Sequence, residues 1–132
     1  MSLMRWEPGY QLGRDDMDDT HREFIDLVNA ADESPDDEAF KAAFHALVQH
    51  TRAHFEHENR LMEESGFYAL HVHVGEHHRV MRQMDQVNER VQLGMLKLGR
   101  EVLAGMPSWF AQHAATMDSA LAAHLKAKAL EV

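Results

Sequence analysis

Seven residues stand at spacings that could bring their side chains together inside a helical protein. A helix turns by about 100° per residue, so side chains four positions apart lie on one face. The pairs His54-x3-Glu58 and His73-x3-His77 have this spacing. A single histidine precedes them, and a looser pair, five positions apart, follows. In chain order the set is His21, His54, Glu58, His73, His77, His113 and Asp118.

The chemistry of this set is that of a site for two metal ions. Imidazole and carboxylate donors without sulfur suit iron, manganese, zinc or copper better than calcium or magnesium. Seven ligands are too many for one such ion. If the two carboxylates bridge two ions, the five imidazoles divide three and two, which leaves one ion with a vacant position. A vacant position beside a second redox-capable metal is what reversible oxygen binding requires.

The pair His113-x4-Asp118 is the weakest geometric link in the set. Five positions correspond to about 140° around an ideal helix, so the two side chains would diverge. Both can point inward only if the helix is locally distorted, or if the shorter aspartate approaches from the flank. We expect a one-residue helical bulge here, because such bulges gather at functional sites.

The chain has 11 histidines, so any single histidine is weak evidence for a metal ligand. We expect ordinary surface or core positions for the six outside the set. His50, one helical turn before His54, is expected near the site but not as a ligand. Trp109 is expected in the core, and its place one turn before His113 also makes it a candidate pocket wall. The other histidines expected outside the site are His45, His57, His71, His78 and His124.

Apolar residues at helical spacing predict the elements that position these side chains. Gly66 is expected to end the second helix, and Ser34 to mark its start. Pro107 is expected either to interrupt the helix or to stand in the first turn of the last helix. The predicted helices cover residues 18–31, 35–64, 68–91 and 107–126, with a weaker helical stretch over 95–104.

Four helices with short connections predict an all-α, antiparallel up-down-up-down four-helix bundle. Residues 1–16, with Trp6, Pro8 and Gly9, break any period and predict an irregular N-terminal arm that lies across the bundle. The length of 132 residues suits one domain, with residues 17–128 as the bundle.

Composition narrows the function classes. A net charge of −9 makes nucleic acid and anionic membrane poor partners. The chain has no cysteine, which excludes disulfides, thiolate metal sites and a cysteine nucleophile. It has no apolar run near the roughly 20 residues that span a bilayer, and its first residues lack a signal-peptide core. We therefore expect a cytoplasmic protein. We also expect a monomer, because the exposed helix faces show no long apolar stripe.

Several stretches resemble the bacterial hemerythrin family over essentially the whole chain. They are Trp6 in the arm, Asp18-Asp19-Thr20-His21, His54-Phe55-x2-Glu58 continuing to Leu61-Met62-Glu63-Glu64-Ser65-Gly66-Phe67, His73-x2-Glu76-His77, and Trp109-Phe110-x2-His113-x4-Asp118.

The resemblance implies a site with two non-haem iron ions, joined by an oxo or hydroxo bridge, that binds O2. Glu58 and Asp118 would bridge the two irons. One iron would be held by His73, His77 and His113. The other would be held by His21 and His54, and this second iron would bind the oxygen. The five-residue spacing to Asp118 is the spacing of this family.

The sequence also departs from the family pattern near the site. Tyr68 stands where a proline is common, and His50 where a tyrosine is common. Pro107 just before Trp109 could shift the entry of the last helix. Ala114 replaces the bulky isoleucine or leucine that commonly follows the fourth-helix histidine. Less bulk there could widen the pocket, admit water and speed autoxidation.

Three functions remain open at this stage. Oxygen binding for transport, storage or sensing fits best, since the histidine-rich set lacks the paired Glu-x2-His motifs of oxygen-activating bundles. An oxidase, peroxidase or nitric-oxide-handling enzyme is the second interpretation, supported by the small side chain of Ala114. Iron or other metal buffering is the third.

Overall fold

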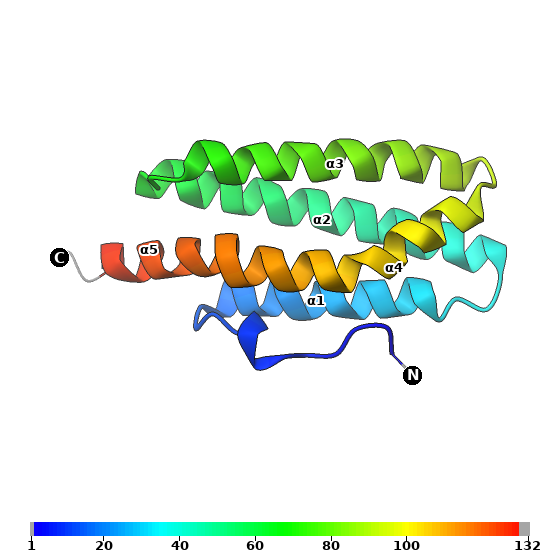
Figure 1. The fold of residues 1–132 in the computed structure, drawn as a ribbon, viewed down its shortest axis with the longest axis horizontal. Helices are drawn as coiled ribbons and strands as arrows, with labels where there is room; N and C mark the ends of the chain where they lie inside the picture. Colours follow the sequence, from blue (N-terminus) through cyan, green and yellow to red (C-terminus); the bar gives the residue numbers. More distant parts are fainter. Residues whose placement is uncertain (1, 130–132) are drawn as a thin grey trace.

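The computed structural model describes residues 2–129, and all regular structure in this part of the chain is helical. Helices α1, α2 and α3 run in alternating directions. The last three helical elements follow one another without a break and form the fourth rod of the bundle (Figure 1). The antiparallel four-helix bundle predicted from the sequence is thus confirmed. The elements are η1 (Pro8–Tyr10), α1 (Asp15–Asp32), α2 (Asp37–Ser65), α3 (Leu70–Gln92), α4 (Leu96–His113), the π-helix η2 (Ala114–Asp118) and α5 (Ser119–Ala129).

The helix ends follow local capping chemistry. Helix α2 begins after Asp36, whose side chain accepts a hydrogen bond of 2.8 Å from the backbone N–H of Ala39. The predicted start at Ser34 was therefore early, because the Ser34 hydroxyl instead donates to the carbonyl of Ala30 near the end of α1. Gly66 ends α2 as predicted. It has the left-handed backbone (φ 65°) that favours glycine at this position.

The prediction for Pro107 was wrong, since α4 continues through it without interruption. Proline removes one backbone hydrogen bond and crowds the preceding turn, and a helix can accommodate both by bending. Figure 1 shows that α4 changes direction along its length. Near its start, Gly99 lets α4 approach α3 closely. A β-carbon at this position would lie only 2.6 Å from a methyl group of Val91 in α3.

The buried interior consists of two apolar clusters with a polar layer between them. The larger cluster includes Phe24, Phe55 and Phe110, and the smaller one includes Met17 and Met62. The chain passes from one cluster to the other as it runs along α1 and along α2. The polar layer lies at these crossings, where His21 falls between Met17 and Phe24, and Glu58 between Phe55 and Met62.

The N-terminal arm packs along α1 (Figure 1). Asn29 fixes its start with two hydrogen bonds to the backbone of Met4, of 2.8 and 2.9 Å. Further along, Asp18 accepts hydrogen bonds from the backbone N–H groups of Leu12 and Gly13. Because both contacts hold the arm against α1, Tyr10 is buried beside the bundle core.

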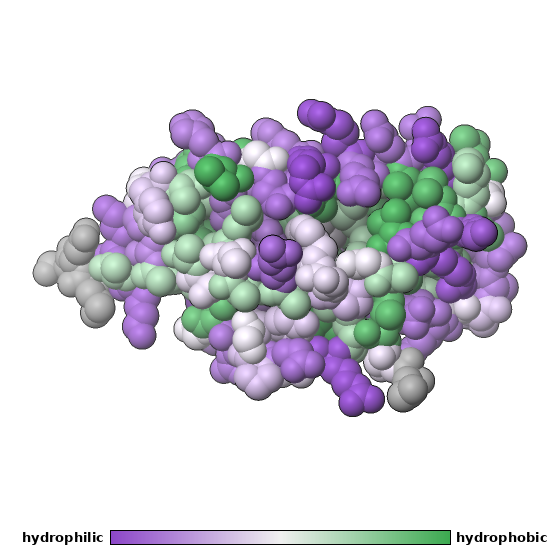
Figure 2. All heavy atoms as spheres, in the orientation of Figure 1, coloured by the Kyte–Doolittle hydropathy of each residue, from purple (hydrophilic) through white to green (hydrophobic). Residues whose placement is uncertain are grey.

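Polar side chains cover much of the face in Figure 2, while hydrophobic ones gather where α4 meets the later part of α3. Among the helices within residues 2–129, none is both long enough and apolar enough to cross a membrane.

Candidate metal centre

The structure gathers all seven predicted residues in the polar layer of the bundle. His21 comes from α1, His54 and Glu58 from α2, His73 and His77 from α3, and the last two from the end of α4 and from η2. All seven are buried, and His21 and Asp118 have no exposed surface. Residues separated by up to 97 positions in the sequence thus meet away from water.

The ligand atoms form two groups that share the two carboxylates. In each group, all potential ligand atoms lie within 4.8 Å of one another. The three-histidine group contains His73, His77 and His113, and the two-histidine group contains His21 and His54; Glu58 and Asp118 belong to both. This is the three-and-two division expected from the sequence.

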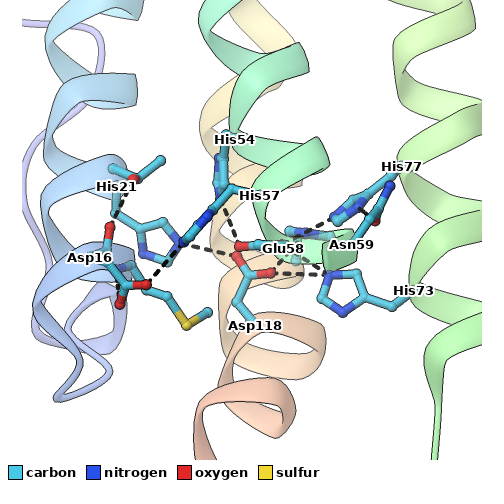
Figure 3. A network of polar contacts seen from close by, with 12 residues as sticks. Asp16, His21, His54, His57, Glu58, Asn59, His73, His77 and Asp118 are labelled. Carbon is cyan, nitrogen blue, oxygen red and sulfur yellow. Dashed lines mark hydrogen bonds and ion pairs between the residues drawn. The ribbon is translucent and has the colours of Figure 1, made fainter. Parts of the chain in front are cut away.

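Each carboxylate directs one oxygen to each group (Figure 3). Glu58 Oε2 lies 2.7 Å from His54 Nε2, and Glu58 Oε1 lies 3.2 Å from His77 Nε2. Asp118 Oδ2 lies 3.0 Å from His21 Nε2, and Asp118 Oδ1 lies 3.0 Å from His113 Nε2. His73 completes the arrangement, with its Nε2 atom 3.4 Å from Glu58 Oε1 and 3.2 Å from Asp118 Oδ1.

The three-histidine group contains buried polar atoms that lie 3.0–3.4 Å from one another without forming well-aligned hydrogen bonds. They include the Nε2 atoms of His73, His77 and His113 and the inward oxygens of Glu58 and Asp118. Buried polar atoms without partners cost free energy, and two facing carboxylates repel each other. Five lone-pair donors that converge on one point are satisfied together by a cation. The residues therefore fit a metal ion at this point by their own chemistry.

The five-residue spacing between His113 and Asp118 is explained by η2. This π-helix spans Ala114–Asp118, so it begins directly after His113 and ends at Asp118. A π-helical turn accommodates one more residue than an α-helical turn. The extra residue offsets the divergence expected on an ideal helix, and both side chains point into the polar layer. The predicted bulge is confirmed.

Contacts outside the seven residues hold two of the imidazoles in place. His21 Nδ1 donates to the backbone carbonyl of Tyr10 at 2.9 Å, and His77 Nδ1 donates to the side-chain oxygen of Asn59 at 2.8 Å. Such bonds leave Nε2 as the ring atom free to bind a metal. Sequence analysis missed both partners. A backbone carbonyl carries no side-chain signal, and Asn59 is distinguished only by following Glu58.

Aromatic rings close the three-histidine side. Phe55 stacks on His77 with ring centroids 3.9 Å apart and an interplanar angle of 8°. Trp109 stacks on His113 at 4.8 Å and 18°. Trp109 is thus a wall of the site, as the sequence indicated. On the other side, the rings of Phe110 and His21 meet edge to face, with centroids 4.9 Å apart. These apolar faces limit water around the polar layer.

Without a metal, the carboxylates and imidazoles stabilise one another as ion pairs. Burial and the charge of Asp118 each raise the pKa of Glu58, but attraction and hydrogen bonding to His54 outweigh them and hold it well below its ordinary value. Burial lowers the pKa of His73, yet contacts with Asp118 and Glu58 raise it to about 9. For His77, burial prevails and the pKa is lowered.

The other six histidines do not join either group. His50 pairs with Glu23 and His57 with Asp16, each at 3.0 Å. His124 donates to the carbonyl of Ser65. The remaining three, at positions 45, 71 and 78, are exposed. None of these six histidines belongs to either ligand group, as expected from the sequence.

Comparison with known proteins gives the family. Residues 12–125 match the family model of the Hemerythrin HHE cation binding domain. The chain belongs to the hemerythrin family. A bacteriohemerythrin of Ralstonia nicotianae is 39% identical over 119 residues, which cover 89% of this chain and 85% of the relative. A bacteriohemerythrin of Stenotrophomonas maltophilia is 28% identical over 130 residues, covering 96% of this chain and 84% of the relative.

Solved hemerythrin structures share the fold. Two crystal structures of hemerythrin point mutants superpose on this chain with a TM-score of 0.83 at 21% identity. Each match covers 95% of this chain and 98% of the other. The hemerythrin bundle is therefore the fold of this chain.

Proposed function

We propose that this hemerythrin-family protein binds O2 reversibly at a pair of non-haem iron ions joined by shared carboxylates. The observation that carries the proposal is the division of oxygens in Glu58 and Asp118, each with one oxygen toward three imidazoles and one toward two. Two adjacent iron ions held there would supply one electron each, which is the requirement for holding oxygen without an added reductant.

The residues assign different roles to the two groups. His73, His77 and His113, together with both carboxylates, offer five ligand atoms to one ion. His21 and His54 with the same carboxylates offer four to the other. The smaller set leaves more of the second ion's coordination positions free for an exogenous ligand. We infer that oxygen binds on the two-histidine side.

The surroundings favour binding over further oxidation chemistry. The seven residues are buried between apolar clusters, and the hydrogen-bonded partners of His21 and His77 are a backbone carbonyl and a neutral amide. Neither partner is an acid at neutral pH that would supply protons for cleavage of bound oxygen. The names of the bacteriohemerythrin relatives agree with this function.

The deciding experiment combines a metal count with a visible spectrum. The metal-free protein is loaded with ferrous iron under anaerobic conditions, and its spectrum is recorded before air, after air and after removal of oxygen. We expect two irons per chain and a charge-transfer band that appears with air and disappears on deoxygenation. Zinc-loaded protein, which should remain colourless, is the matched control because zinc has no redox chemistry.

Other outcomes would replace this proposal with a specific alternative. Two irons that oxidise at once, without a stable coloured adduct, would support an oxidase or peroxidase. Two irons that bind without any response to air would support metal buffering. One iron per chain, or none, would mean that the seven residues do not act together as ligands.

A further inference from the structure

A groove between α3 and α4 lies next to the three-histidine group, from which it is separated by the ring of Trp109. Its volume is about 390 Å³, within the range of small-molecule sites. Val80 and Met84 of α3 form one wall, and Val102 and Met106 of α4 form the other. Figure 2 shows hydrophobic side chains gathered over this region. Exposed apolar concavities of this kind are common ligand sites.

Polar groups are confined to the edge of the groove. Gln83 and Glu101 are exposed lining residues. Arg79, at the same edge, already donates to Glu76 at 2.7 Å, so its charge is compensated. An apolar floor with an uncharged donor and an acidic acceptor at its edge suits a flat ring system that carries hydroxyl or carbonyl oxygens. It suits a strongly anionic ligand poorly.

Trp109 connects the groove with the candidate metal centre. Its ring lines the groove, and the same ring stacks on His113 at 4.8 Å. Its indole N–H is buried and has no hydrogen-bond partner. A molecule in the groove is therefore separated from a proposed metal ligand by a single aromatic side chain.

We propose that this groove binds a hydroquinone of one or two rings, which reduces the oxidised form of the iron centre. The inference rests on the proposed function, because an iron pair that has lost its electrons no longer binds oxygen. The chain has no cysteine and so no thiol of its own to restore them. In the step, one hydroquinone becomes a quinone. Its two electrons reduce two ferric ions to ferrous ions, and its two protons pass to water at the open edge of the groove.

Binding is tested first on the metal-free protein, where no iron chemistry contributes. In a Trp6→Phe background, Trp109 is the only tryptophan, because the chain has two. Its fluorescence is titrated with the two-ring quinone menadione at concentrations below its solubility limit. We expect saturable quenching. Free N-acetyltryptophanamide gives the collisional quenching to be subtracted.

Two leucine substitutions locate the binding site. Gly105 lines the groove, and a β-carbon there would meet no atom within 4 Å. Gly105→Leu therefore fills the groove and should weaken menadione binding about tenfold, a loss of about 1.4 kcal/mol. Gly75→Leu, at an equally open glycine of α3 that does not line the groove, should leave binding unchanged. Both replace a helical glycine, so neither should impair folding.

The reduction rate then tests the redox role. Reduced menadione should reduce the ferric protein with saturating kinetics, and Gly105→Leu should slow this reaction about tenfold, in line with the binding loss. Dithionite, a small inorganic reductant, should reduce both proteins equally.

Quenching that survives in Gly105→Leu would overturn the binding site. Equal menadione-hydroquinone rates despite lost binding would overturn the role as reductant. Failure of the iron loading or of the oxygen band would instead refute the proposed function, and would leave the quenching result intact.

Discussion

The two histidine–carboxylate pairs of the centre reach the same layer by different backbone geometries. In α2, which is regular, His54 and Glu58 are four residues apart, and their side chains meet at 2.7 Å. In the fourth rod, His113 and Asp118 are five residues apart across the π-helix η2, and their side chains approach to 3.0 Å. The first pair uses a longer carboxylate, and the second uses a shorter one on a locally widened helix.

The spacing of two ligand residues along a helix is therefore meaningful only together with the geometry of the turn between them. Aspartate is one methylene shorter than glutamate, and it is placed by the π-helix η2 instead of by a regular helical turn. Both carboxylates end with one oxygen toward each histidine group. If the two carboxylates are equivalent in function, removing either one should have the same effect on metal binding.

The largest effect is expected from removing either carboxylate. Glu58→Ala and Asp118→Ala should each lose both metal ions, because each carboxylate belongs to both ligand groups. The loss should exceed the roughly 10–100-fold decrease in affinity typical of changes one shell further out. Metal per chain after gel filtration, with circular dichroism to verify folding, gives the result.

Glu56→Ala, at an exposed position between His54 and Glu58, is the control and should retain both ions. If Asp118→Ala kept one ion while Glu58→Ala kept none, the two pairs would not be equivalent. The bridge would then rest on α2 alone.

A smaller effect is expected from removing one imidazole of each pair. His54→Ala leaves one histidine on its side, so that ion should be lost and one ion per chain should remain. His113→Ala leaves two histidines and both carboxylates on the other side, which equals the natural two-histidine set. It should therefore keep two ions, with one held more weakly.

Isothermal titration of the metal-free variants distinguishes these outcomes. One ion per chain in both variants would mean that the third imidazole is indispensable. The two groups would then differ in more than the number of their histidines.

Much of this comparison could be predicted from the sequence, and the parts that could not depend on long-range contacts. Side-chain type and helical spacing were enough to select the seven residues and to anticipate the bulge before Asp118. The start of α2 was misplaced, because Ser34 and Asp36 are both good caps and only the carbonyl of Ala30 decides between them. Nothing local indicates that the Tyr10 carbonyl lies beside His21.

Pro107 is a second position at which local sequence preference did not predict the structure. Its local preference is to break a helix, but α4 continues through it while packed against α1, α2 and α3. That the seven residues act as ligands stays a prediction, to be tested by the metal counts above.

A pH effect on the metal-free protein is expected next. His54 and His73 have raised pKa values, the latter about 9, so their stabilising contribution is present below pH 6.5 and lost as the pH rises toward 9. Glu58 and Asp118 have lowered pKa values, so their contribution is present above about pH 4 and lost in acid. His77 opposes the first trend, since its pKa is lowered.

The melting temperature of the metal-free protein should therefore be highest between about pH 5 and 6.5. It should decline toward pH 9, and bound metal should abolish that decline because metal binding requires neutral imidazoles. A metal-free protein that grows more stable from pH 6.5 to 9 would contradict the ion-pair description of the layer.

Ala114, the first residue of η2, should have a several-fold effect on autoxidation. It is fully buried in the same cluster as Tyr10 and Phe110. Ala114→Ile should slow autoxidation of the oxygen adduct by adding bulk that excludes water beside the site, at a packing cost of about 1–3 kcal/mol. Ala115→Ile, at the exposed next position, is the control for the β-branched side chain. An unchanged decay rate of the oxygen band would count against a role for bulk at this position.

The smallest effect is expected from deleting Ala115. One residue removed from an ideal helix rotates everything beyond it by about 100°. In η2, however, the deletion removes the extra residue of the π-helix, so the chain can continue as a regular α-helix with α5 in its present register. His113 and the aspartate would then be four residues apart, as His54 and Glu58 are now, and two metal ions should still bind.

Deleting Glu56 from the regular helix α2 is the matched comparison, and it should lose both ions because Glu58 is rotated out of the layer. Should the Ala115 deletion also lose both ions, the π-helix would be more than an extra residue, and the short aspartate would need its widened turn to reach the metals.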